Sequence, residues 1–186
     1  MKKILPQKLQ FASVFLLLLS ACYPDLKPEK VTSGAANFSK SIALGGNFMA
    51  GYQDGALYKK GQQLAIPALL AEQFKQVGGI SFNQALMPDN KGLGLNDKPW
   101  ESWFVQASHL GFKSDCQGVS SLFPLRDTIS KSLATSYLTG IAGNSVQNLA
   151  VPFANTTDYF NPNFGNYFPA NTNKNPYYFR IASNPG

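Results

Sequence analysis

The segment SIALGGNFMAG, residues 41–51, decides the fold that this sequence predicts. It opens with a short apolar run, which Gly45 and Gly46 then interrupt. Apolar residues that stop at a glycine pair are typical of a buried strand entering a tight turn. We therefore predict a strand over residues 41–44, followed directly by a turn.

The next regular element is a helix that we predict over residues 67–77. Pro67 suits the first turn of a helix, apolar residues fall on one side of it, and two glycines follow Val77. Strand, glycine turn and helix form the opening unit of an α/β sheet, here with an insertion over residues 54–63. The predicted fold class is α/β, with a parallel sheet begun by residues 41–44, flanking helices and long loops.

The rest of the chain carries weaker structural signals. Residues 88–99 are expected to form a loop, and residues 128–137 a second helix. From Phe153 onward, asparagine, proline and nine aromatic residues dominate. Such rings either form a stacking surface for sugars or acyl chains or pack on the body of the domain, and packing is the favoured interpretation.

Composition limits the class of protein. The chain has 186 residues, of which 44% are hydrophobic and 13% aromatic, which is enough for one domain with a core. Its net charge is +6, but three lysines lie among the first ten residues and no basic stripe follows, so no nucleic acid is expected as a partner. One histidine and two cysteines argue against a His/Cys zinc site, and we expect neither a metal nor a cofactor.

The N-terminus, residues 1–21, is typical of a secretory signal. Three lysines precede an apolar stretch over residues 11–19 that is too short to span a bilayer. The stretch ends in LSAC at residues 19–22, which resembles the lipobox of bacterial lipoproteins. The alternative is an ordinary secreted protein that is cut near Ala21.

The lipobox resemblance implies that Cys22 becomes the mature N-terminus and carries acyl chains. Several chains anchor a protein stably, so we expect a lipid-anchored envelope protein, and Tyr23 after the cysteine favours the outer membrane. Residues 22–40 are predicted to be the lipidated tether and residues 41–186 the folded domain. Cys116 then has no disulfide partner and is expected to be a half-buried structural residue.

Three short motifs resemble blocks of the SGNH/GDSL hydrolases (lipases and esterases), most closely a Bacteroidetes-type lipoprotein branch. LGGNFMAGY at residues 44–52 resembles the Gly-Asp-Ser-Leu block after the first strand. NLAVPFA at residues 148–154 is similar to a segment ending Val-Pro-Gly-Ala, whose glycine supplies an oxyanion-hole N–H. NPYYFR at residues 175–180 resembles the stretch before a Gly-x-Asn-Asp block. The resemblance implies an incomplete flavodoxin-like three-layer fold that holds the N-terminal portion of such a domain.

The residues at the family's catalytic positions differ from the family pattern. Asn47 occupies the position of the serine nucleophile, and Phe153 that of the block-two glycine, so these two residues mark the oxyanion-hole positions. The third-block asparagine and the Asp-x-x-His pair are absent, and His109 has no aspartate three residues before it. Ester hydrolysis by a serine needs nucleophile, base and N–H donors together, so we predict no esterase activity.

Two functions remain open. The first is a lipoprotein related to SGNH/GDSL ester hydrolases but catalytically incompetent, either as an N-terminal fragment or as a relic without activity. The alternative is a non-catalytic cell-surface lipoprotein that binds glycan or lipid. In both cases the expected partners are the membrane, through the lipid anchor, and an ester, acyl or glycan ligand.

Overall fold

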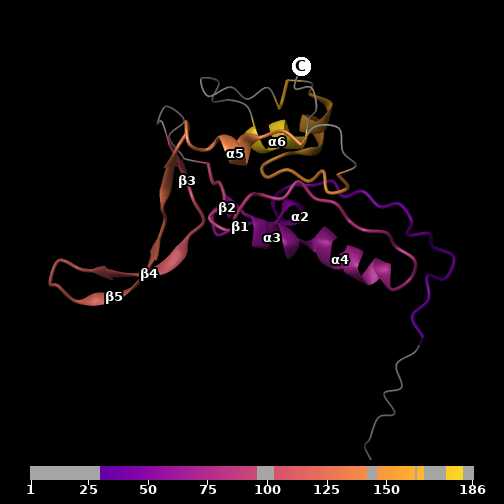
Figure 1. Cartoon of the computed structure of the whole chain (residues 1–186), viewed down its shortest axis with the longest axis horizontal. Helices are drawn as coiled ribbons and strands as arrows, with labels where there is room; N and C mark the ends of the chain where they lie inside the picture. Colours follow the sequence, from indigo (N-terminus) through magenta and orange to yellow (C-terminus); the bar gives the residue numbers. More distant parts are fainter. Residues whose placement is uncertain (1–29, 96–102, 142–145, 162, 166–174, 182–186) are drawn as a thin grey trace, which may run out of the picture. The chain divides into compact units, whose positions relative to one another are not determined.

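The computed structural model of the chain describes residues 30–95, 103–141, 146–161, 163–165 and 175–181. Contacts divide the chain into two units, Met1–Thr32 and Ser33–Gly186, and the second unit contains every helix and strand given below (Figure 1). The predicted signal, Cys22 and the first part of the predicted tether lie outside the described residues. Within the described part of the chain, no helix is both long and apolar enough to cross a bilayer.

The three sheets of the described residues are all two-stranded and antiparallel, so the predicted parallel sheet is wrong there. They pair β1 (Tyr52–Gln53) with β2 (Ala56–Leu57), β3 (Trp103–Val105) with β6 (Thr128–Ser130), and β4 (His109–Ser114) with β5 (Ser120–Leu125). The unit does mix helices with these small sheets, so only the coarse part of the prediction, a chain with both helices and strands, agrees with the structure.

Among the described residues, the parallel pairing consists of two isolated bridges at Asn148, with Ala43 on one side and Gln84 on the other. Two backbone hydrogen bonds of 2.8 Å join Ala43 to the residues on either side of Asn148. The pairing stops because the chain turns after each bridge: the glycine pair follows the first segment, and the Leu86 N–H closes a tight turn on the Gln84 carbonyl. Residues 41–44 therefore contribute one bridge instead of the predicted sheet strand.

A helical turn and a small hairpin follow the glycine pair. Helix α2 (Asn47–Ala50) ends at Gly51, whose φ of 81° is left-handed. In the β1–β2 hairpin the two turn residues, Asp54 and Gly55, have φ values of 53° and 73°. Positive φ at both positions is the type I′ turn, whose twist matches that of the strands, and Asp-Gly is a preferred pair for it.

Helices α3 (Lys59–Gln63) and α4 (Ile66–Lys75) come next in the chain. Helix α4 confirms the helix predicted over residues 67–77, with a proline in its first turn and ends one or two residues from the predicted bounds. Its buried face carries the small residues Ala68 and Ala71, whereas Leu69 and Leu70 are exposed. The helix therefore packs closely through alanines, and its leucines do not cover a sheet.

The second predicted helix, over residues 128–137, is wrong in its first half. Residues Thr128–Ser130 form strand β6, where Ile129 lies opposite Phe104, and the helix α5 covers only Thr135–Leu138. β-Branched residues fit a pleated strand well, and pairing with β3 decides the conformation here.

The β4–β5 hairpin has no counterpart in the sequence prediction. Its turn is closed by Asp115, whose Oδ1 accepts hydrogen bonds from the backbone N–H groups of Gln117 and Val119 at 2.8 and 2.9 Å. Cys116 lies exposed in this turn, so the expectation of a half-buried cysteine is wrong. These two hydrogen bonds of the turn are made to the Asp115 side chain, and the Cys116 thiol is left exposed to solvent.

The hydrophobic core draws on α2, β2, β3, α5 and α6 (Pro176–Ile181), and α5 lies beside α6 (Figure 1). Its buried members are Ala50, Leu57, Met87, Leu93, Phe104, Ala134, Tyr137, Val151 and Tyr177. The rings of Tyr159 and Phe164 each contact the ring of Tyr178, which supports the packing interpretation for that part of the aromatic C-terminal segment. Phe153 and Phe160, the latter at the end of the 3₁₀ helix η1 (Thr156–Phe160), are exposed instead.

Candidate functional site

Asn47 is the first residue of α2, and the glycines before it bring the backbone into a narrow space. Gly45 has a φ of 149°, and a Cβ atom on it would lie only 2.7 Å from Cγ of Met49. A Cβ atom on Gly46 would lie 3.4 Å from the carbonyl oxygen of Ala154. The turn therefore requires glycine at position 45 and places Asn47 next to the segment that follows Val151.

The side chain of Asn47 bonds to Phe153, the second oxyanion-hole position expected from the sequence. The backbone N–H of Phe153 donates to Oδ1 of Asn47 at 2.8 Å. The two residues are 106 positions apart in the chain, so only tertiary structure can bring them together. The structure thus joins the two positions that the motifs singled out.

Phe153 has the backbone conformation for which a glycine would be suited. Its φ is 64°, in the left-handed region, which is unfavourable for a bulky side chain. Its ring packs edge-on against Tyr52, with 4.9 Å between the ring centroids, and the residue stays 48% exposed. The ring therefore contacts Tyr52, while the N–H is directed to Asn47.

Tyr159 ties the two segments of the site together. Its hydroxyl lies 2.9 Å from the Gly45 carbonyl and 3.0 Å from the Leu149 carbonyl, and burial raises the pKa of this phenol. The Val151 N–H also donates to the Gly45 carbonyl, at 2.9 Å. The segments that carry Asn47 and Phe153 are therefore joined independently of the bond between those two residues.

A hollow of about 500 Å³ lies beside this pair. Small or apolar, polar and aromatic residues line it: Leu44, Gly45, Gly46, Ala154, Asn155, Thr156, Tyr159 and Phe160. Phe160 is 83% exposed. The hollow therefore offers both polar groups and an open aromatic ring to a ligand.

The only histidine of the chain lies elsewhere. His109 is exposed at the start of β4 and lines a separate hollow of about 390 Å³, together with Asp54 and Asp127. No residue that lines this hollow also lines the one beside Asn47. The structure therefore does not bring His109 to the position of a general base for residue 47.

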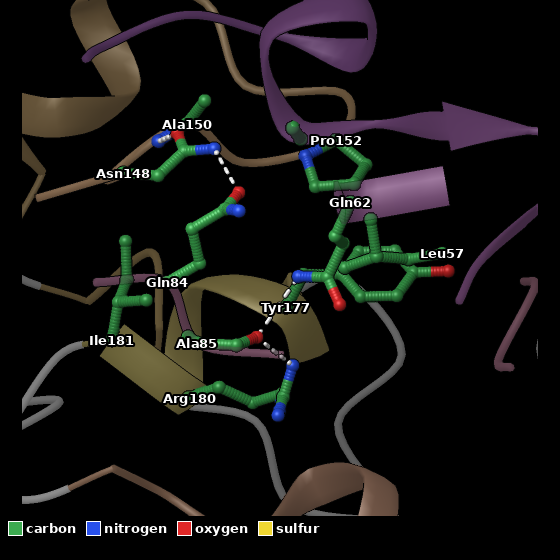
Figure 2. A pocket seen from close by; sticks show the side chains of 11 residues that line it. Leu57, Gln62, Gln84, Ala85, Asn148, Ala150, Pro152, Tyr177, Arg180 and Ile181 are labelled. Atoms are coloured by element: carbon green, nitrogen blue, oxygen red, sulfur yellow. Dashed lines mark hydrogen bonds between the residues drawn. The ribbon is translucent and has the colours of Figure 1, made fainter. Parts of the chain in front are cut away.

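A second group of polar side chains, which sequence reasoning did not single out, is buried around Asn148 (Figure 2). The Asn148 Nδ2 group donates to the carbonyl oxygen of Met49 at 3.0 Å and to Oε1 of Gln84 at 3.1 Å. Gln62 Nε2 donates to the carbonyl oxygen of Ala85 at 2.9 Å. The one feature of the sequence that could have indicated this buried group is Asn148 itself, an amide residue directly before the apolar run at residues 149–152.

The function is indicated neither by a cluster of metal-binding side chains in the described residues nor by similarity to a known protein. Among the residues that the structure describes, no three His, Cys, Asp or Glu side chains gather where they could hold a metal ion. Comparison of the chain with protein-family models, with curated proteins and with solved structures gives no match. The function is therefore argued from the site itself.

Proposed function

We propose that this chain is a lipid-anchored relative of the SGNH/GDSL ester hydrolases that does not hydrolyse esters. The observation that supports the proposal is the 2.8 Å hydrogen bond between the Phe153 N–H and Asn47 Oδ1. The motif resemblance assigns these positions to a nucleophile and to an oxyanion-hole donor. The two motifs lie far apart in the sequence, so their meeting in space supports the resemblance.

The side chains at these positions favour a site that does not catalyse ester hydrolysis. Hydrolysis requires a hydroxyl that loses its proton to a base, and free N–H donors that stabilise the resulting oxyanion. Asn47 carries an amide, and His109 lines a different hollow. The Phe153 N–H already donates to the Asn47 amide oxygen, which takes the place that an oxyanion would need.

Turnover of p-nitrophenyl acetate and butyrate tests the catalytic half of the proposal. We expect rates no higher than buffer for the wild type and for Asn47→Ser. Loss of one triad member typically costs on the order of 10⁴-fold, and here the base is missing as well. Asn155→Ser, the same substitution at an asparagine that lines the neighbouring hollow, is the matched control. Saturable turnover by the wild type would overturn the proposal.

Amide hydrogen exchange of Phe153 tests the geometric half. We expect slow exchange in the wild type and in Asn47→Asp, which keeps an acceptor, and faster exchange in Asn47→Ala. Asn37→Ala is the control, because the Asn37 Oδ1 accepts from the nearby Ser39 N–H and not from the Phe153 N–H. Equal exchange in the wild type and Asn47→Ala would remove the observation on which the relationship rests.

The anchor in the proposal rests on the lipobox-like motif at residues 19–22. Cys22→Ala is expected to move the protein from the membrane fraction to the soluble fraction. Cys116→Ala, which alters the other cysteine, should leave it on membranes, and density separation should place it with outer membranes. Unchanged fractionation of Cys22→Ala would show that the anchor assignment is wrong.

A second candidate function, binding of glycan or lipid without catalysis, is favoured by the hollow beside Asn47. An open ring such as that of Phe160 next to polar groups suits stacking on a sugar or an acyl chain. Binding to glycan arrays and lipid strips should be lost in Phe160→Ala but kept in Phe112→Ala, which removes an equally open phenylalanine from the β4–β5 hairpin. Absence of any binding by the wild type would count against this function.

A further inference from the structure

Arg180, near the end of α6, carries its charge inside the folded unit. It is only 4% exposed. Its Nη1 donates to the carbonyl oxygen of Ala85 at 2.9 Å, and its Nη2 to that of Leu86 at 2.8 Å. The third nitrogen, Nε, has no hydrogen bond, and no other buried side-chain nitrogen or oxygen of the described residues lacks one.

No carboxylate of the described residues balances this charge. Asp54 bonds to Tyr58 and Asp89 bonds to Tyr137. Burial lowers the pKa of Arg180 to about 10, and no acidic group opposes that shift. The guanidinium therefore keeps its charge at neutral pH, and a buried ion without a counter-charge is unfavourable.

A small cavity adjoins Arg180 (Figure 2). Its volume is about 20 Å³, which suits a single water-sized particle but not a phosphate or a carboxylate. Its polar lining includes Gln62, Gln84, Asn148 and Tyr177. The Oε1 of Gln84 accepts from Asn148, and the Nε2 of Gln84 makes no hydrogen bond within the described part of the chain.

We propose that this cavity binds one small monovalent anion of chloride size, held by the side chain of Arg180. Within the described part of the chain the Arg180 Nε group has no hydrogen-bond partner, and Arg180 lines the cavity together with Gln84. A one-atom anion supplies the missing negative charge and needs little more room than a water molecule. A water molecule would satisfy the Nε group but would add no negative charge to a guanidinium that no described carboxylate balances.

Thermal unfolding of the purified chain in sodium chloride and in sodium gluconate, at equal ionic strength, tests the proposal. Both salts screen charges equally, but gluconate does not fit the cavity. Once chloride exceeds its Kd, the Tm should rise by about 3–5 °C for each tenfold increase in chloride, and gluconate should have no such effect. Equal Tm values in the two salts at every concentration would overturn the proposal.

Two arginine variants form a matched pair for this measurement. Arg180→Met removes the proposed anion partner, so the difference between the salts should disappear. Arg126→Met alters the other arginine of the chain, which also donates to backbone carbonyls but is exposed, and the difference should remain. Loss of the chloride effect in Arg126→Met as well would count against the proposal.

A third variant and a direct measurement keep the test decisive if Arg180→Met does not fold. Gln84→Glu places a carboxylate beside the cavity, so it should raise the Tm at low chloride and abolish the dependence on chloride. In crystals of the wild type soaked in bromide, an anomalous peak in the cavity beside Arg180 would support the site. Water at this position, with bromide bound only elsewhere, would overturn it.

Discussion

The β4–β5 hairpin and the region around Asn148 both contain backbone pairing, but side chains surround that pairing very differently. In the hairpin six residue pairs are in register, yet Phe112 is 75% exposed and Leu110 and Leu122 are exposed as well. Around Asn148 the pairing is reduced to two bridges, while the asparagine side chain is buried and fully bonded. The longer ladder is local, whereas the shorter one joins segments distant in sequence. We infer that the buried amide contributes more to the stability of the unit than the hairpin ladder.

The largest expected effect is that of Asn148→Ala. The substitution leaves the Met49 carbonyl, the Gln84 side chain and the Ala150 N–H without their partner. We expect the free energy of unfolding to fall by about 3 kcal/mol, because each buried group left unpaired costs about 1–3 kcal/mol. Urea denaturation measures the loss. Gln117→Ala in the hairpin turn is the control and should change stability by less than about 0.5 kcal/mol; similar losses for both variants would refute the comparison.

A smaller effect is expected for Asn47→Ala at the candidate site. The Phe153 N–H loses its acceptor, and its left-handed backbone loses one of its restraints. We expect a loss of about 1 kcal/mol by urea denaturation, the usual net value of one hydrogen bond. Asn47→Asp keeps an acceptor and should be as stable as the wild type at pH 7. A loss in Asn47→Asp equal to that in Asn47→Ala would argue that packing, and not the hydrogen bond, matters.

Tyr137, a member of the hydrophobic core, makes the stability of the core depend on pH. The β4–β5 hairpin has no tyrosine and lacks this dependence. Burial and the hydrogen bond to Asp89 raise the pKa of Tyr137 from 10.0 to about 12. The protonated phenol is therefore favoured in the folded state. Its contribution to stability is complete below pH 10 and is lost as the pH rises towards 12. Thermal melts between pH 8 and 12 should show a gentler decline in Tyr137→Phe than in the wild type, and parallel curves would contradict this assignment.

The smallest effect on stability is expected for Phe112→Thr in the hairpin. The ring is open to solvent, and threonine suits a strand, so the free energy of unfolding should change by less than about 0.5 kcal/mol. The same urea titration measures it. A loss above about 1 kcal/mol would mean that this face of the hairpin is covered in solution, and the contrast with the Asn148 region would weaken.

The features that local sequence patterns predict well are those that local interactions decide. Helix α4 follows from its proline, its apolar spacing and the glycines beyond it, and the structure has it within one or two residues of the prediction. Strand β6 does not follow in this way, because Ile129 is paired with Phe104 from a distant segment. The parallel sheet fails for a related reason: residues 41–44 suit a strand, but their neighbours turn away after one bridge.

The candidate site likewise has parts that the sequence predicts and parts that depend on contacts between distant segments. Motif resemblance identified Asn47 and Phe153 separately, and the structure places them in hydrogen-bond contact. The buried group of Gln62, Asn148 and Arg180 is hard to predict, because amides and arginines are usually exposed. Its one sequence signal, the amide before the apolar run at residues 149–152, does not mark the three residues as neighbours. The β4–β5 hairpin could have been predicted from the sequence, since Asp115 and Gly118 mark a turn between two short segments that contain apolar residues.

The exposed Cys116 makes the hairpin turn a place for site-specific labelling. The chain has two cysteines, so acylation of Cys22 would leave Cys116 as the one thiol able to react with a maleimide dye. The turn is held by the Asp115 side chain, so a dye there would follow the hairpin rather than a loose end. Quenching of that dye by spin-labelled lipids would then measure how far the hairpin stands from the bilayer.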